Sequence, residues 1–458
     1  MPGMTEPMPR SDRSRTILAL LGVSLLLVGL LAAGVFWSLS RRVDALGEHI
    51  AQEALTLSSA RRPRPSHVDV PTPGSLAQAL KPLLPELLRS FQAEARLSES
   101  VKQNCREVGD GQRPVSELAP ECGNPLVRDR ALIRRTLQAS RTEEAGLPLE
   151  MQLLELSVTP YAQSGLAALQ RIVRLAALDV RLQVSEEHPD DALGECLDAL
   201  ALARDMAHGG GLMGTMMSTH GHEVLFIPCL DALQRASPSA VRQATLALRR
   251  IREGLSPFSS AMNEERILEV IRNLGEVLGD GQRAALPERV RLPVNKHAAS
   301  SRGIYAPRSP TLLRHALLQF HRYHQQLVPL MDLPLAARTL QLEKAQRPLR
   351  DSWNWYLSQE VSTFEQFAVR ADLQRIQLDL LQALAWVKTY RTEHGEWPSA
   401  LPTPAPGPAV LLPTPLQLQA GTEGTLVIRP SEDLLRDLEA DSRRHSSQSP
   451  PLEVTARP

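Results

Sequence analysis

The sequence predicts an all-α protein with one N-terminal transmembrane helix, antiparallel helical hairpins in two groups, a small C-terminal β-hairpin and a disordered tail. Three observations predict this fold class. Residues 16–39 form an uncharged apolar run, apolar residues recur at helical spacing over long stretches after residue 76, and prolines become frequent after Pro398. A length of 458 residues with 43% hydrophobic content is enough to build a substantial core.

The apolar run is long enough to cross a bilayer. At about 1.5 Å per residue, an uncharged helix over residues 16–39 would be about 36 Å long. The run is too long for the apolar part of a cleaved signal peptide, and no A-x-A site follows it. We therefore expect an uncleaved signal anchor that contacts the lipid bilayer through these residues.

Flanking arginines indicate the orientation of this helix. Arg10, Arg13 and Arg15 precede the apolar run, whereas two arginines, Arg41 and Arg42, follow it. Since positive charge is retained on the cytoplasmic side, the count favours a cytoplasmic N-terminus. The expected location is the bacterial inner membrane, in a single pass, with the bulk of the chain in the periplasm.

Composition and periodicity divide the chain into segments. The stretch RRPRPSHVDVPTPGS has prolines and no apolar periodicity, which is typical of a stalk, and 286–311 also breaks the helical pattern. The expected segments are a cytoplasmic arm at 1–15, the span at 16–39, an amphipathic stretch and Pro-rich stalk at 40–75, a helical domain at 76–285, a connecting loop at 286–311, a second helical group at 312–398 and a Pro-rich tail at 399–458.

Local signals predict where some elements begin and end. Ser237 and Asn263 suit helix N-caps, and Gly254 and Gly279 suit helix ends. In the tail, LQLQ and TLVIRP alternate around AGTEG, which predicts one β-hairpin. From about Asp441 we expect disorder.

Four cysteines allow two disulfides outside the cytoplasm. Cys105 and Cys122 flank a Gly- and Pro-containing stretch, so a bridge between them would close a loop of ordinary size. If two helices turn at Gly209–Gly211, Cys196 and Cys229 lie about 18 Å and about 26 Å from the bend. We therefore expect the first bridge and not the second.

The stretch HGGGLMGTMMSTHGHE, residues 208–223, invites several functional interpretations. A lipase-like oxyanion loop follows a strand and needs G-x-S-x-G elsewhere, a Walker loop needs G-K-[ST], and a dinucleotide loop needs G-x-G-x-x-G after a strand. None of these patterns is completed in the sequence. The favoured interpretation is a bend between two helices.

Metal binding is the main alternative for the histidines. His222 and Glu223 begin an H-E-x-x-H pattern that fails because position 226 is Phe, and His220 and His222 point apart on a helix. In LLRHALLQFHRYHQQL, His321 and His324 could pair as two ligands. Buried imidazoles without a metal are the more frequent case, so we expect no metal site and no catalytic residue.

Aromatic residues gather in WNWY, residues 353–356. Trp353, Trp355 and Tyr356 could stack a sugar, dock a peptide or lie at a membrane surface, although packing at the start of the following helix is the favoured interpretation.

A helix ending in Y-R and followed by x-x-[HN]-G-x-[WY]-P-x-x-L occurs near residue 400. The matching residues are Tyr390, Arg391, His394, Gly395, Trp397, Pro398 and Leu401. This segment resembles the helix exit of major pseudopilins, and it is similar to the last domain of uncharacterised, single-pass, helix-rich bacterial envelope proteins. The span lacks the prepilin cleavage signature, and the second resemblance implies no known activity.

Together these features favour an interaction or assembly role in the bacterial envelope over catalysis. Charges balance at 51 against 51, so no electrostatic field indicates nucleic-acid binding. We expect no cofactor, and we expect protein partners in the envelope. Two alternatives are a membrane-anchored hydrolase, with or without a metal, and a ligand-sensing ectodomain with the aromatic residues in its pocket.

Overall fold

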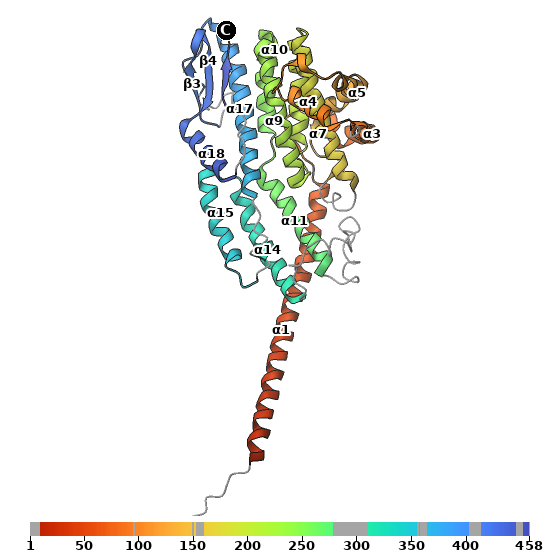
Figure 1. Cartoon of the computed structure of the whole chain (residues 1–458), viewed down its shortest axis with the longest axis vertical. Helices are drawn as coiled ribbons and strands as arrows, with labels where there is room; N and C mark the ends of the chain where they lie inside the picture. Colours follow the sequence, from red (N-terminus) through yellow and green to blue (C-terminus); the bar gives the residue numbers. More distant parts are fainter. Residues whose placement is uncertain are drawn as a thin grey trace, which may run out of the picture.

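The structure is a computed structural model, and it describes residues 10–94, 97–148, 151–152, 160–277, 310–354, 357, 364–402, 414–445 and 452–457. Within these residues the chain is all-α apart from short strands, as predicted. The long helices of the body run close to the direction of α1, and the C-terminal strands lie beside α17 (Figure 1).

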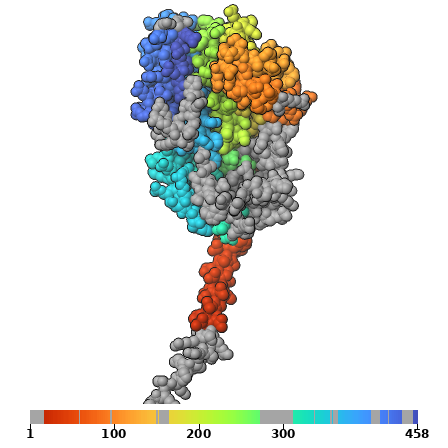
Figure 2. Space-filling model, viewed as in Figure 1, coloured from red at the N-terminus to blue at the C-terminus, as the bar shows by residue number. Residues whose placement is uncertain are grey.

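Helix α1 (Arg10–Ser59) is one continuous helix. Its apolar side chains are exposed from Ile17 to Val35, and one span in this helix is long and apolar enough to cross a membrane. Beyond the exposed apolar residues of α1, Val43 and Ile50 are buried against α11 and α14. The exposed part of α1 therefore projects from the body (Figure 2), while its last third belongs to the core.

Most of the body is a helical bundle around one core. Its central helices share buried apolar residues, because each carries them at i, i+3, i+4 and i+7. The helices of this region are α2 (Leu76–Leu80), α3 (Leu84–Glu94), α4 (Glu99–Gly109), α5 (Pro120–Ala139), α7 (Pro160–Ser185), α8 (Pro189–Asp205), α9 (Gly211–Arg235), α10 (Pro238–Glu253) and α17 (Phe364–His394).

The end of the body nearest the exposed part of α1 contains α11 (Phe258–Val277), α14 (Pro310–Leu330) and α15 (Leu335–Arg350). Because α17 packs beside α9 and α10, the second helical group shares the core of the first. Of the connecting loop expected at 286–311, residues 286–309 lie outside the described residues, and Pro310 and Thr311 begin α14.

Two small sheets complete the fold. Strands β1 (Thr72–Ser75) and β2 (Thr142–Glu144) pair in parallel. The predicted hairpin is confirmed as β3 (Leu416–Ala420) and β4 (Leu426–Pro430). The tail continues as α18 (Glu432–His445), and β5 (Val454–Ala456) pairs with β4. The expectation of disorder from Asp441 is therefore wrong for β5, whose Val454 and Ala456 are buried.

The expected helix boundaries are confirmed in part. Ser237 caps α10, since its side chain accepts a hydrogen bond from the Ala240 backbone, and Gly254 is the C-cap of the same helix. Asn263 lies inside α11, which begins at Phe258, and Gly279 lies outside the described residues. Gly395 follows α17 with φ +79°, the left-handed conformation expected after a helix end.

Both pairs of cysteines form disulfides. The Cys105–Cys122 bridge is confirmed, with the Cα atoms 5.6 Å apart. The expectation that the other pair stays unbridged is wrong, because Cys196 and Cys229 are joined, with their Cα atoms 5.7 Å apart. The difference comes from the register of the two helices that carry them.

The end of α8 and the start of α9 are offset along the helix axes, so they do not lie side by side at the bend. They pack side by side at Ala203 and Gly221, where a Cβ added to the glycine would lie 2.9 Å from the alanine Cβ. Cys196 is seven residues before Ala203 (203 − 196), and Cys229 is eight after Gly221 (229 − 221). Helix α9 therefore extends past the end of α8, and the non-helical residues 206–210 span the difference.

The segment expected to be a stalk packs against the body instead. Residues 61–75 follow α1 and lead into β1, and Arg64 and His67 within this segment are buried. Prolines keep the chain extended here, so the segment has no helical periodicity even though it has tertiary contacts.

Candidate functional site

The HGGG stretch forms a bend, as favoured by the sequence. Gly209 has φ +90° and Gly211 has φ +57°, so the chain turns through backbone conformations that glycine adopts readily. The Gly211 N–H donates a 2.8 Å hydrogen bond to Glu264 of α11, and Arg62 pairs with the same carboxylate at 2.8 Å. The start of α9 is thus fixed to α11 and to the 61–75 segment.

The structure separates His220 from His222. The His220 side chain is half-buried, with Nε2 3.2 Å from an Arg174 nitrogen and Nδ1 3.6 Å from Glu223. The His222 ring lies in the core, where Nδ1 is 2.9 Å from the Ser218 carbonyl and 2.8 Å from the Gln374 amide. Burial lowers the pKa of His222 to about 4, so this imidazole is neutral at physiological pH.

Two of the three histidines of α14, His321 and His324, are also buried. His321 lies near Arg266, and burial together with this charge lowers the pKa of His321 to about 4. His324 packs against Phe364, with ring centroids 5.8 Å apart. Within the described residues, no group of three or more His, Cys, Asp or Glu side chains is arranged to hold a metal ion.

The aromatic stretch is described only in part. Trp353 is 72% exposed, so it does not pack under the start of α17 as the favoured interpretation expected. Trp355 and Tyr356 lie outside the described residues. The Trp353 ring packs on His315 of α14, with centroids 5.0 Å apart.

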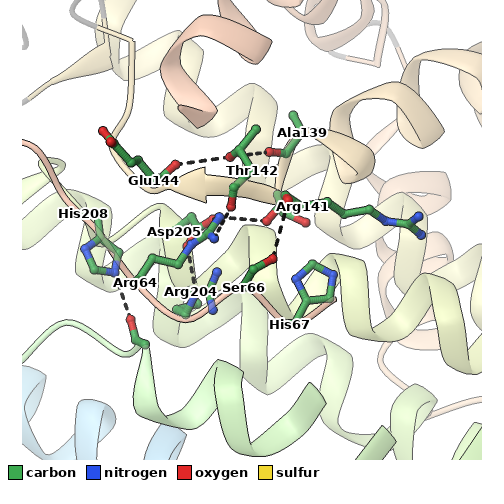
Figure 3. Close-up of polar contacts among 12 residues, drawn as sticks. Arg64, Ser66, His67, Ala139, Arg141, Thr142, Glu144, Arg204, Asp205 and His208 are labelled. Atoms are coloured by element: carbon green, nitrogen blue, oxygen red, sulfur yellow. Dashed lines mark hydrogen bonds and ion pairs between the residues drawn. The ribbon is translucent and has the colours of Figure 1, made fainter. Parts of the chain in front are cut away.

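A buried charge cluster, which we call the Asp205 cluster, joins the 61–75 segment to the end of α8. It consists of Arg64, Arg204 and Asp205 (Figure 3). Arg64 donates to both carboxylate oxygens of Asp205, at 3.0 and 2.8 Å, and Arg204 donates to one of them at 2.7 Å. Arg64 also donates to the Ser140 carbonyl at 2.8 Å, and it bonds the Thr142 carbonyl.

This arrangement keeps the central carboxylate charged. Burial alone would raise the pKa of Asp205, but the charges and hydrogen bonds of Arg204 and Arg64 outweigh burial and lower the pKa to about 2. Arg204 also donates to the Pro65 carbonyl at 3.1 Å, which ties α8 to the extended chain. The cluster therefore fixes the segment that follows α1 onto the body.

A second carboxylate of α8, Asp198, connects this interior to the surface. His67 Nε2 lies 2.7 Å from Asp198, and Arg141 makes a bidentate pair with it at 2.9 and 2.6 Å. Burial lowers the pKa of His67 more than the Asp198 carboxylate raises it, so the neutral ring donates from Nε2. Asp198 thus contacts the 61–75 segment on one side and an open groove on the other.

The groove runs between the end of α5, the end of α7 and the start of α8, and its volume is about 560 Å³. Three arginines of α5 and the loop after it contribute to its lining, and acidic residues come from the α7–α8 side. The charged residues of its lining include Arg130, Arg134, Arg141, Glu186, Glu195 and Asp198. Both signs of charge therefore face one concave surface, which suits a polar ligand or partner.

Glu195 in the lining of the groove forms a carboxyl pair with Asp179, which is buried behind it. Gln183 donates to Glu195 at 2.7 Å and to Asp179 at 3.3 Å, and Arg130 pairs with Asp179 at 3.1 Å. Burial first, and then the Asp179 carboxylate, raises the pKa of Glu195 to about 7. Glu195 therefore gains or loses a proton near neutral pH, which is also a property of many general acid–base residues.

Sequence reasoning missed both the Asp205 cluster and the carboxyl pair. A signal was present in each case, because Arg204–Asp205 and Asp179 interrupt otherwise apolar helical faces. A charged side chain on an apolar face indicates a buried partner. Arg64 and Arg130, which bond Asp205 and Asp179, are 141 and 49 residues away in the sequence, so the pattern alone could not identify them.

Neither known protein families, nor curated proteins, nor solved structures gave a match to this chain.

Proposed function

We propose that this chain is a single-pass protein of the bacterial inner membrane whose periplasmic helical body binds protein partners of the envelope. The observation that carries the proposal is the continuity of α1. Its apolar half is exposed over Ile17–Val35, and its other end is buried in the core at Val43 and Ile50. Such a helix would hold the body at a fixed height and angle over the bilayer.

The disulfides support the periplasmic location. All four cysteines are paired, as Cys105–Cys122 and Cys196–Cys229. Structural disulfides persist in the periplasm and are rare in the cytoplasm. The arginine count around the span favours the same orientation.

The groove is the surface that we assign to partner binding. It is concave, it carries both signs of charge, and Asp198 in its wall contacts His67 of the segment that follows α1. An extended polar segment of a partner would meet arginines on one side and carboxylates on the other. Charge complementarity of this kind provides specificity and speeds association.

Photocrosslinking in cells tests the partner-binding role. A benzoylphenylalanine replacing Arg134, which lines the groove, should give a reproducible adduct with a small set of envelope proteins. The matched control is the same substitution at Glu343, an exposed residue of α15. Adducts at position 343 without any at 134, or none at either, would contradict this assignment.

Orientation is tested separately. Alkaline phosphatase fused after residue 458 should be active, because the enzyme needs the oxidising periplasm. Cytoplasmic location of the fusion would reverse the proposed topology and remove the argument from the disulfides.

A hydrolase is the second candidate, because Glu195 lines an open groove and its pKa is raised to about 7. General acid–base catalysis uses carboxyl groups tuned in this way. If a screen of ester, peptide and glycoside substrates reveals an activity that Glu195→Gln abolishes, the hydrolase replaces the interaction protein as the favoured function.

A further inference from the structure

We propose that the membrane-proximal end of the body rests on the bilayer surface, with Trp353 in the lipid headgroup region. This inference rests on the proposed function, because it requires α1 to span that bilayer. It adds a second lipid contact, made by a part of the chain more than 300 residues after the span (353 − 39 = 314).

The end of the apolar span marks the level of the interface. Phe36 and Trp37 are 42% and 59% exposed, and the Arg41 guanidinium lies 4.0 Å from the centre of the Trp37 ring. Arg42 is exposed, and Val43 is already buried in the body. Aromatic rings followed by arginines are typical of the boundary between hydrocarbon and headgroups.

Helix α14 begins at the same level. The Arg314 guanidinium lies 4.8 Å from the centre of the Phe36 ring, and Leu317, one turn further along α14, packs in the cluster that contains Val43. The two helices therefore ascend together from the interface into the body. The first turn of α14 lies where α1 leaves the body (Figure 1).

Trp353 is attached to this first turn by two contacts. Its ring lies 5.0 Å from the His315 ring, and the neighbouring Asn354 side chain donates a 3.2 Å hydrogen bond to the Leu312 carbonyl. Asn354 is 1% exposed, so the loop that carries Trp353 is held firmly. A firmly held loop presents Trp353, 72% exposed, at the end of the body nearest the bilayer.

The bilayer is the occupant that these contacts favour. Trp353 packs on His315, and the next residue towards the helix start, Arg314, packs on Phe36 of the span. A lipid surface that surrounds Phe36 therefore reaches Trp353 without a further component. Tryptophan is favoured at this depth because its apolar ring can leave water while its N–H stays hydrogen-bonded.

Site-specific fluorescence in proteoliposomes tests this inference. The four native cysteines are bonded in pairs, so an introduced cysteine supplies the thiol for labelling with the environment-sensitive dye NBD. The full-length chain would carry the dye at Trp353→Cys or, to retain the tryptophan, at the adjacent exposed Asp351→Cys. The matched control is Leu246→Cys, an exposed apolar position of α10 at the opposite end of the body.

The expected result is that lipids with a nitroxide near the headgroup quench the dye at positions 353 and 351 at least about twofold more than at 246. Blue-shifted emission should accompany this quenching. Equal quenching and equal emission at all three positions would overturn the inference.

A fourth position separates this inference from the proposed function. Leu27→Cys, midway along the apolar run, should be quenched by a nitroxide deep in the acyl chains. If position 27 is quenched and 353 is not, the span is retained and the surface contact is rejected. If position 27 is not quenched, α1 does not span the bilayer, and both proposals fail.

Discussion

Two carboxyl groups of helix α8, Asp205 and Glu195, have pKa values that are shifted in opposite directions. On its inner side, two arginines keep Asp205 ionised, with a pKa of about 2. On its groove side, burial and the carboxylate of Asp179 raise the pKa of Glu195 to about 7. Burial raises both pKa values, so the sign of the neighbouring charge makes the difference.

The comparison distinguishes a structural carboxylate from one that can respond to its surroundings. Asp205 has lost contact with solvent and joins α8 to the 61–75 segment through Arg64. Glu195 faces a groove and changes its charge near neutral pH. Four predictions test this distinction, from the largest expected effect to the smallest.

The largest effect is expected for Asp205→Asn. The substitution leaves two buried guanidinium groups without a carboxylate, and breaking a buried ion pair costs about 3–5 kcal/mol of unfolding free energy. Thermal unfolding of the detergent-solubilised chain, followed by circular dichroism, would measure the loss. Asp69→Asn is the control, because the side chain of Asp69 is 84% exposed and its pair with Arg250 should contribute less than about 1 kcal/mol.

The next effect concerns the bridge that holds α8 against α9. Replacing Cys196 and Cys229 together by Ala should lower the unfolding free energy by about 2–4 kcal/mol, since the bridge closes a loop with a sequence separation of 33. Replacing Cys105 and Cys122 by Ala should lower the unfolding free energy by less, because their separation of 17 residues closes a shorter loop. Equal or reversed losses in chemical denaturation would contradict this ranking.

Glu195→Gln should have a pH-dependent effect. The folded protein binds a proton at Glu195 that the unfolded chain, with a carboxyl pKa near 4.5, releases, so this group makes stability fall as pH rises from about 4.5 to about 7. The variant lacks this fall, so its Tm relative to the native protein should rise between pH 5 and pH 8. Glu186→Gln changes an exposed residue of the same groove, so its Tm relative to the native protein should stay constant between pH 5 and pH 8.

The smallest effect is expected from His222. Its contribution to stability changes with pH in the opposite direction to that of Glu195. The folded-state pKa of about 4 lies below the ordinary value of 6.5, so this group contributes stability above pH 6.5 that is lost as pH falls towards 4. His222→Gln should reduce the loss of Tm between pH 7 and pH 5 relative to the native chain. If the variant loses as much Tm between pH 7 and pH 5 as the native chain does, the ring is protonated in the folded state.

Much of the fold could be predicted from local pattern. The apolar run predicted the exposed part of α1, helical spacing predicted α7 to α11, and alternation around AGTEG predicted β3 and β4. These features depend on residues close together in the sequence. The predicted end of α17 is confirmed for the same reason, since Gly395 adopts positive φ and Trp397 folds back to lie 4.3 Å from the Arg391 guanidinium.

What could not be predicted depends on which faces meet in space. The Cys196–Cys229 bridge depends on the offset between α8 and α9, and a bend of unknown path does not fix that offset. Arg64 lies in a proline-rich stretch that resembles a linker, yet its carboxylate partner is 141 residues away. Likewise, the groove requires α5 to pack beside the α7–α8 corner, which helical periodicity alone does not indicate.

The continuity of α1 also constrains how the protein is made. Val43, Ile50 and Ala54 emerge early in synthesis, directly behind the apolar run, but they pack on Ile267 and Leu317. Their apolar face therefore stays uncovered until more than 200 further residues have been translated (267 − 54 = 213). A water-soluble fragment for crystallisation should accordingly begin near residue 40, because one that begins at residue 60 would leave α11 and α14 without the helix that completes their core.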